Sequence, residues 1–308
     1  MKLYLIRPRG FCAGVVRAID TVEKSLLKWG PPIYVKHEIV HNRHVVQTLK
    51  DKGAVFVDDL NDVPKGSRII FSAHGVTPLL REKAEKRSLF TIDATCNLVN
   101  RVHMAAKRFA EKGYRIILIG HRNHVEIIGT KGEAPAATTV IEKVQDVKKL
   151  PFSKKEKMIY LTQTTLSVDD VEEITNELRK RYPDIESLPS SSICYATMNR
   201  QRGLKHIAKY VDIIFVIGDE KSSNSNRLKE VALNQNAIAY LINSEKEIKS
   251  CWLKNVKAIG MTAGASTPEY IVQRCVKTLK TMGVNKVKEI IYKDENVHFD
   301  LPYPLEKK

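Results

Sequence analysis

The stretch RGFCAGVVRAI, residues 9–19, places Cys12 between two glycines at the point where an apolar run ends and a helical pattern begins. The run before it, KLYLI at residues 2–6, is typical of a buried strand. The segment after it, VVRAIDTVEKSLLKW at residues 15–29, has apolar residues at intervals of three and four, as an amphipathic helix does. Cys12 is therefore expected at a strand-to-helix turn.

The same pattern recurs at Cys96, between LFTIDAT and LVNRVHMAAKRFAEKG, and at Cys194, between SSSI and NRQRGLKHIAKYV. After each helix comes a second strand with a polar loop, and after a further helix a third strand with a second polar loop. The first loops carry His41, then His124 and Glu126, then Ser222, Ser223 and Asn224. The second loops carry His74, Thr164 and Ser266.

Strands that alternate with helices over short loops indicate right-handed parallel α/β units. The chain is thus expected to form three related α/β modules with parallel sheets, at residues 1–88, 89–187 and 188–281, followed by a tail at 282–308. Ligands collect at the carboxyl ends of parallel strands. Around a pseudo-threefold axis, three such edges would face one central cavity, and each would contribute a cysteine.

Composition narrows the class of protein. The chain has 308 residues, and its N-terminus lacks the apolar stretch of a signal peptide. No apolar run reaches the length of a membrane span, so a soluble cytoplasmic protein is expected. The net charge of +16 favours anionic partners. The basic residues are scattered without interleaved aromatic residues, which disfavours a nucleic-acid face.

Three thiolates from three modules would suit an iron–sulfur cluster in which one iron has no protein ligand. The alternative is that each cysteine is a small buried residue. Cys251 and Cys275 lie in helical patterns outside the repeat and are interpreted as structural. The five cysteines include no CxxC pair, which argues against a zinc finger, and disulfides are not expected in a reducing compartment.

The polar loops suggest an anion pocket, because their side chains and the adjacent helix N-termini offer hydrogen-bond donors that suit a diphosphate. Glu126 follows His124 by two residues, and in an extended segment both would point the same way. A carboxyl group in that place could act as a general acid. No GxGxxG or GxxxxGK[ST] motif is present, so electrons for a reduction would come from outside.

Together the segments resemble the LytB/IspH family, the 4-hydroxy-3-methylbut-2-enyl diphosphate reductases that end the non-mevalonate isoprenoid pathway. The resemblance extends from residue 8 to about residue 268 and rests on PRGFCAGV, HEIVHNR, FSAHGV, DATC, GH..H.E..GT, TQTTLSVDD, ICYATMNRQ, SSNSNRL and TAGAST. It implies a trefoil of three modules around one oxygen-sensitive 4Fe–4S cluster per chain, held by Cys12, Cys96 and Cys194. The substrate hydroxyl would bind the fourth iron.

The resemblance also implies roles for the loop residues. Thr164 would lie near the substrate hydroxyl, and Glu126 would deliver protons. The diphosphate would be held by His41, His74, His124, Ser222, Ser223, Asn224 and Ser266. Two electrons and two protons would convert the substrate to isopentenyl and dimethylallyl diphosphates. The positive charge would suit an acidic ferredoxin or flavodoxin as electron donor. A monomer or homodimer is expected, with neither nucleic acid nor membrane as partner.

Two positions depart from the family pattern, since Asn97 and Val125 stand where proline is common. They put the rigidity of the cluster loops and the product ratio in doubt more than the reaction. Two rival functions stay open at this point. One is a cysteine-dependent hydrolase of a phosphorylated substrate with Cys12 or Cys96 as nucleophile, and the other is a basic RNA-binding protein. The tail at 292–308 either closes over the cavity or packs on the surface.

Overall fold

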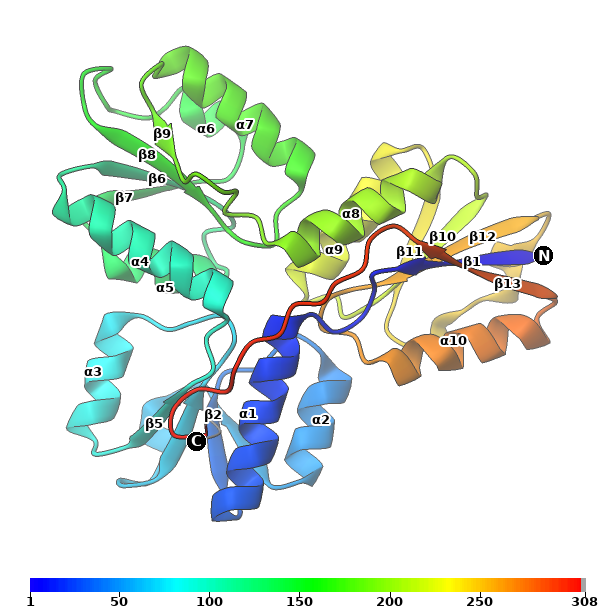
Figure 1. The fold of residues 1–308 in the computed structure, drawn as a ribbon, viewed down its shortest axis with the longest axis horizontal. Coiled ribbons are helices and arrows are strands. Elements are labelled where there is room, and N and C mark those ends of the chain that lie inside the picture. Colours follow the sequence, from blue (N-terminus) through cyan, green and yellow to red (C-terminus); the bar gives the residue numbers. More distant parts are fainter. Residues whose placement is uncertain (306–308) are drawn as a thin grey trace. The chain divides into compact units, whose positions relative to one another are not determined.

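The computed structural model describes residues 1–305 and contains three parallel β-sheets with flanking helices (Figure 1). The β2 sheet has the order β3 (Ala54–Val57), β2 (Ile33–Lys36), β4 (Arg68–Phe71), β5 (Phe90–Asp93). The β6 sheet has the order β7 (Thr138–Ile141), β6 (Arg115–Ile119), β8 (Met158–Thr162), β9 (Glu186–Ser187). The β10 sheet has the order β11 (Ile238–Ile242), β10 (Ile213–Ile217), β12 (Ala258–Ala263), β1 (Lys2–Arg7), β13 (Lys286–Ile291). The prediction of three parallel α/β modules is confirmed.

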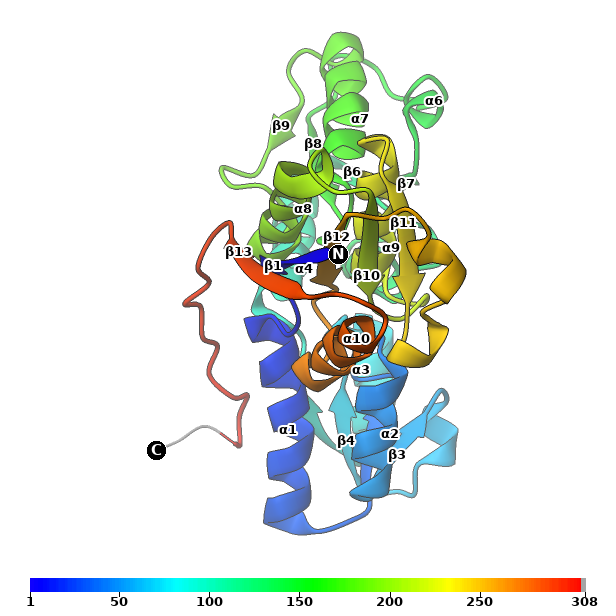
Figure 2. The same ribbon diagram turned by 90° about the vertical axis from the view of Figure 1, so that its right-hand side faces the viewer.

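The first four strands of each sheet follow one order, and the fourth is the strand that precedes a cysteine in the sequence. This strand is β5 beside β4, β9 beside β8, or β1 beside β12. Strand pairing departs from chain order at two of the expected module limits. β5 precedes Cys96 but belongs to the β2 sheet, and β1 precedes Cys12 but pairs with β12 and β13 (Figure 2). The limits at 88 and 281 therefore do not coincide with the sheets, because strand pairing follows lateral hydrogen bonds rather than chain order. How the chain divides into domains stays a prediction.

The helices that follow Cys12, Cys96 and Cys194 occupy the segments that the apolar periodicity indicated. The α-helices are α1 (Ala13–Trp29), α2 (Arg43–Asp51), α3 (Pro78–Lys86), α4 (Asn97–Glu111), α5 (Val125–Glu133), α6 (Val144–Val147), α7 (Val168–Arg181), α8 (Tyr195–Ala208), α9 (Ser223–Asn234) and α10 (Glu269–Thr281). Short 3₁₀ helices are η1 (Leu60–Asp62), η2 (Glu245–Glu247) and η3 (Ser250–Leu253). Within residues 1–305, no helix combines the length and the apolar character that a membrane span requires.

The packing of the core explains why the sequence of a central parallel strand is apolar throughout. In β10, Ile213, Phe215 and Ile217 pack in one hydrophobic cluster, whereas Ile214 and Val216 pack in another on the opposite face. A parallel sheet covered by helices on both faces buries every residue of such a strand. The run IIFVI is therefore apolar throughout rather than alternating with polar residues.

The chain forms two compact units. The first unit contains Met1–Val15, His41–Val46 and Tyr195–His298, and it holds the β10 sheet. The second unit contains Val16–Val40, Gln47–Cys194 and the described residues from Phe299 on, and it holds the β2 and β6 sheets. Each unit carries part of the candidate site, so the two parts are described separately.

Candidate active site

The three cysteine turns share one backbone contact. Each cysteine immediately precedes the first residue of a helix, namely α1, α4 or α8. Each backbone N–H donates to the carbonyl oxygen two residues beyond the end of a neighbouring strand. These bonds join Cys12 to Ala265 (3.2 Å), Cys96 to Ala73 (3.0 Å) and Cys194 to Thr164 (2.9 Å). The repeat inferred from spacing therefore has a physical counterpart, which places each thiol at an equivalent point.

The Cys96 turn also connects two sheets. β5 before it lies in the β2 sheet, while α4 after it packs with Val102 and Ala106 against Ile116 and Leu118 of β6. Cys12, Cys96 and Cys194 form no disulfide bond and are partly buried. Of the other two cysteines, Cys251 is exposed in η3 and Cys275 is buried in α10, where desolvation raises the thiol pKa to about 12.

The residues present suit a four-iron cluster by their donor chemistry. In the described part of the chain, no group of three His, Cys, Asp or Glu side chains is arranged to enclose a single metal ion. A four-iron cluster makes a different demand, because each cysteine thiolate binds its own iron. Three partly buried cysteines that form no disulfide bond, each at an equivalent turn, suit that demand.

In the first unit, the loops around Cys12 bring together several of the expected substrate residues. Asn224 accepts a hydrogen bond at Oδ1 from the N–H of Ala265 (2.9 Å), the residue whose carbonyl receives the Cys12 N–H. The Ser266 hydroxyl donates to the carbonyl oxygen of His41 (3.0 Å). These bonds hold the loops after β10 and β12 beside the Cys12 turn and beside His41, which lies two residues before α2.

Ser222 and Ser223 mark the start of α9. The Ser222 side chain is the N-cap and accepts a hydrogen bond from the N–H of Ser225 (3.3 Å), while Ser223 is the first helical residue. A hydroxyl has one donor and two acceptor positions, so the Ser222 oxygen can cap the helix and the hydroxyl can still donate to an anion. The helix N-terminus adds a favourable dipole for negative charge.

In the second unit, His74 and His124 lie close together, with ring centroids 6.0 Å apart and an edge-to-face arrangement. Gly75 after His74 has a φ of +79°, and a Cβ there would lie 2.7 Å from Cε1 of His103. Only glycine fits this conformation and this space. The motif AHG in the sequence therefore reflects a backbone requirement that holds the His74 loop against α4.

Glu126, the residue expected to deliver protons, is a buried carboxyl group of the second unit. Its side chain is 2% exposed, and its oxygens accept hydrogen bonds from Thr164 N–H (2.6 Å) and from the Thr164 hydroxyl (3.0 Å). Burial raises the Glu126 pKa to about 7, while the bonds from Thr164 lower it. At neutral pH both protonation states are populated, as a group that transfers protons requires.

The local conformation at Glu126 differs from the expected one. The expectation of an extended segment was wrong, because Glu126 lies in the first turn of α5 and His124 is the N-cap. Nδ1 of His124 accepts the Glu126 N–H at 3.2 Å. In the neutral ring the proton therefore resides on Nε2, which can donate to an anion. The two residues are linked by a helix cap rather than by strand alternation.

Two buried arginines escaped the sequence patterns. Arg200, in α8, donates to the carbonyl oxygen of Gly10 (2.8 Å) and pairs with Glu295 (3.1 Å). Arg17, in α1, donates to the carbonyl oxygen of Thr95 at 3.0 Å, next to Cys96. Each guanidinium thus holds the backbone of a cysteine turn and places positive charge near it. No motif in the sequence marked either arginine, and their burial in the structure reveals them.

The C-terminal segment supplies partners for these arginines. Glu295 also accepts from the side-chain amide of Asn199 (2.9 Å), and the Asp300 carbonyl oxygen accepts from Nε of Arg17 (2.7 Å). The tail was expected either to close over the cavity or to pack on the surface. Its described residues pack against α8 in the first unit and against α1 in the second.

Replacing Arg200 by methionine is expected to lower the free energy of unfolding by about 3–5 kcal/mol, because it leaves the mostly buried Glu295 carboxylate without its partner. The matched control is Arg202→Met, at an exposed position on the same helix, with an expected change within about 0.5 kcal/mol. Urea unfolding measures both. Equal changes in the two variants would show that the buried pair contributes no special stability.

Asn97 and Val125, the two departures from the family pattern, are the first residues of α4 and α5. Proline suits this position, and the residues before them already have extended conformations, with ψ near 135°. Asn97→Pro and Val125→Pro are each expected to stabilise the chain by about 0.4–1 kcal/mol. Thermal unfolding measures this, with Asn97→Ala as the control. A lower melting temperature in either proline variant would contradict the expectation.

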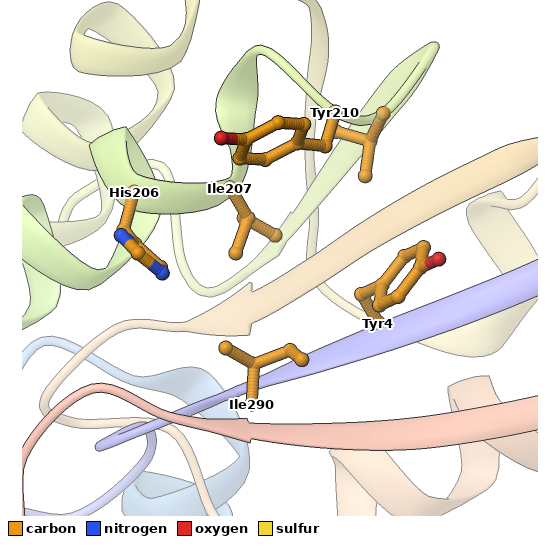
Figure 3. Close-up of a pocket in the computed structure, with 6 residues that line it drawn as sticks. Tyr4, His206, Ile207, Tyr210 and Ile290 are labelled. Carbon is orange, nitrogen blue, oxygen red and sulfur yellow. The ribbon is translucent and has the colours of Figure 1, made fainter.

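One pocket of the first unit contains none of the candidate site residues (Figure 3). It has a volume of about 260 Å³ and is lined by Tyr4, His206, Ile207, Tyr210, Val211 and Ile290. Its lining comes from the end of α8 and the residues after it, together with Tyr4 of β1 and Ile290 of β13, and it includes none of the candidate site residues. We therefore assign it no part in the candidate site.

Comparison with known proteins gives a consistent result. The family model described as LytB protein matches residues 3–280. A 4-hydroxy-3-methylbut-2-enyl diphosphate reductase of Protochlamydia amoebophila is 63% identical over 305 residues, which are 99% of this chain and 97% of the relative. The reductase of the same name from Chlamydia pneumoniae is 56% identical over 306 residues, 99% of this chain and 98% of the relative.

Solved structures agree with these relatives. The structure of the E-1-hydroxy-2-methyl-but-2-enyl-4-diphosphate reductase from Plasmodium falciparum superposes with a TM-score of 0.97 at 48% identity, and the match covers 98% of this chain and 96% of that one. A structure of (E)-4-hydroxy-3-methyl-but-2-enyl diphosphate reductase, described as the terminal enzyme of the non-mevalonate pathway, has a TM-score of 0.65 at 31% identity. That match covers 91% of this chain and 99% of the other.

Proposed function

The chain belongs to the LytB family, and from this premise we propose that it is a 4-hydroxy-3-methylbut-2-enyl diphosphate reductase. The reaction breaks the bond between carbon and the hydroxyl oxygen. Two electrons and two protons are consumed, the oxygen leaves as water, and the products are isopentenyl and dimethylallyl diphosphates. The observation that carries the proposal is the threefold repetition of the cysteine turn with the same backbone bond at each position.

Cys12, Cys96 and Cys194 would hold one 4Fe–4S cluster per chain. Their equivalent turns and the absence of a disulfide bond at any of them support this proposal. When bound, such a cluster supplies electrons one at a time and offers an iron without a protein ligand as a Lewis acid. The arginines beside two of the turns would offset negative charge there. Arg200 holds the Gly10 carbonyl and Arg17 the Thr95 carbonyl.

The diphosphate would be bound by the polar loops at the helix N-termini. Charge-assisted hydrogen bonds from histidine and neutral donors from serine hydroxyls suit phosphate oxygens. In the first unit these are His41, Ser222, Ser223, Asn224 and Ser266, and in the second unit His74 and His124. The Nε2 of His124 is directed away from the helix cap that Nδ1 forms, which supports its use as a donor.

Glu126 would deliver a proton to the leaving hydroxyl, with Thr164 as its partner. At pH values below about 7 the buried carboxyl group is mainly protonated. The Thr164 N–H holds one carboxyl oxygen, and the second oxygen lies 3.0 Å from the Thr164 hydroxyl. The proton can therefore pass through this hydroxyl or directly to the substrate, while burial excludes water from the carboxyl group.

The rival functions have no support from the relatives, which are named as reductases. An electron donor of the ferredoxin or flavodoxin type remains a prediction from the sequence. So do the cytoplasmic location, the monomeric or homodimeric state and the pseudo-threefold arrangement of the modules.

The direct test is to purify the chain without oxygen and follow the loss of 4-hydroxy-3-methylbut-2-enyl diphosphate when reduced methyl viologen supplies electrons. Formation of the two C5 diphosphates, abolished by exposure to air, is expected. Turnover that survives in air, or the absence of turnover from a chain with full iron and sulfide content, would contradict the proposal.

A further inference from the structure

A groove of about 700 Å³ lies on the second unit, outside the candidate active site. One wall is α4, which contributes Arg101, Met104, Lys107 and Arg108. The other wall is the segment after β9, which contributes Leu188, Pro189 and Ser190. All of these residues belong to one compact unit, so the groove is formed within that unit.

The groove combines an apolar surface with positive charge. Met104 is 57% exposed, and Leu188 and Pro189 of the opposite wall add apolar surface. Lys107 and Arg108 beside it are exposed, and among the described lining residues Glu111 is the single acidic one. A small apolar patch flanked by mainly basic residues is suited to an acidic partner that binds briefly.

Both walls of the groove lead to candidate cluster ligands. Arg101 lies five residues after Cys96, which is about 7.5 Å along a helix axis. Ser191 lies three residues before Cys194, at most about 11 Å along the chain. Arg101 connects the walls, because Nη1 donates to the Ser190 hydroxyl (2.7 Å) and Nη2 to the Ser191 carbonyl oxygen. A partner in the groove would thus lie close to two of the three thiols.

We propose that this groove is the docking surface for an acidic electron-transfer protein of the ferredoxin type. The inference rests on the proposed function, which consumes electrons that the chain cannot draw from a nicotinamide or flavin motif. Each docked donor is oxidised by one electron, and two such events with two protons release one water per substrate. The net charge of +16 steers acidic partners toward the chain, and the groove selects where they bind.

The test is the double variant Lys107→Glu, Arg108→Glu, which reverses two exposed charges and leaves the Arg101 bonds intact. With a purified acidic plant-type ferredoxin as donor, KM for ferredoxin is expected to rise about tenfold or more, and its dependence on salt to weaken. With reduced methyl viologen, turnover is expected to stay unchanged. The matched control is Lys148→Glu, Lys149→Glu, the same change at exposed positions of the same unit.

The outcomes separate the two proposals. An equal rise of the KM for ferredoxin in both double variants would assign the effect to net charge. An unchanged KM in both would exclude the groove as the docking surface. If the double variant also loses viologen activity, Met104→Glu replaces it as the test of the same surface. If the unaltered chain gives no turnover with viologen, the proposed function fails, and titration of ferredoxin against both double variants still decides whether the groove binds it.

Discussion

Cys96→Ser is expected to reduce the iron and sulfide content of the anaerobically purified chain at least about tenfold and to abolish turnover. Iron in clusters prefers thiolate ligands, and a serine hydroxyl is both harder as a ligand and rarely deprotonated. When one of the three protein ligands is lost, only two cysteines remain to hold the cluster. The fold is expected to remain, because the N–H of residue 96 still donates to the Ala73 carbonyl whatever the side chain.

Cys12→Ser and Cys194→Ser should behave alike, since the three turns have the same backbone contact. Cys251→Ser is the control, because Cys251 is exposed in η3 and outside the repeat. Colorimetric iron and sulfide assays and the visible absorption of the cluster measure the effect independently of turnover. Normal iron content in any one of the first three variants would remove that cysteine from the ligand set.

Glu126→Gln is expected to lower kcat by about 10² to 10⁴ while the iron content and substrate affinity stay close to those of the unaltered chain. Glutamine has the same shape, and its amide oxygen can still accept the Thr164 N–H, but it cannot deliver a proton. Single-turnover kinetics measure the loss. Glu173→Gln, at an exposed position on α7, is the control. Near-normal turnover in the Glu126 variant would exclude this carboxyl group from the chemistry.

The pH dependence gives a second measure of the same group. Because the Glu126 pKa is raised to about 7, the protonated form required for catalysis falls about tenfold per pH unit above that value. The kcat of the unaltered chain is expected to follow this fall, and Glu126→Gln to lack it. A profile that stays flat to pH 9 in the unaltered chain would contradict the assignment.

The raised pKa of Glu126 also predicts how the stability of the chain changes with pH. A carboxyl group whose pKa is raised on folding contributes fully below its unfolded pKa of about 4.5, and the contribution is lost as pH rises through about 7. Glu126→Gln should therefore raise the melting temperature relative to the unaltered chain at pH 8, and change it little at pH 5. The opposite order would mean that the ionised carboxylate is well stabilised in the folded chain.

Some of the candidate site could be read from local pattern. The order of strand, cysteine and helix is a property of about twenty neighbouring residues, so apolar periodicity reveals it at Cys12, Cys96 and Cys194 alike. The loop residues were found in the same way, by their similar offsets from the cysteines. The local conformation at Glu126 was missed, because a short polar loop contains too few apolar residues to separate a helix start from an extended segment.

The sequence by itself determined the fold class, the position of three cysteines at strand-to-helix turns, and the family. All three depend on motifs and on periodicities within single segments. Only the tertiary structure decided that β1 pairs with β12, that Arg17 and Arg200 hold the cysteine turns, and that Glu126 is buried against Thr164. The physical reason is that lateral hydrogen bonds, burial and the resulting pKa depend on groups distant in the chain. No local pattern records which of those groups will become neighbours.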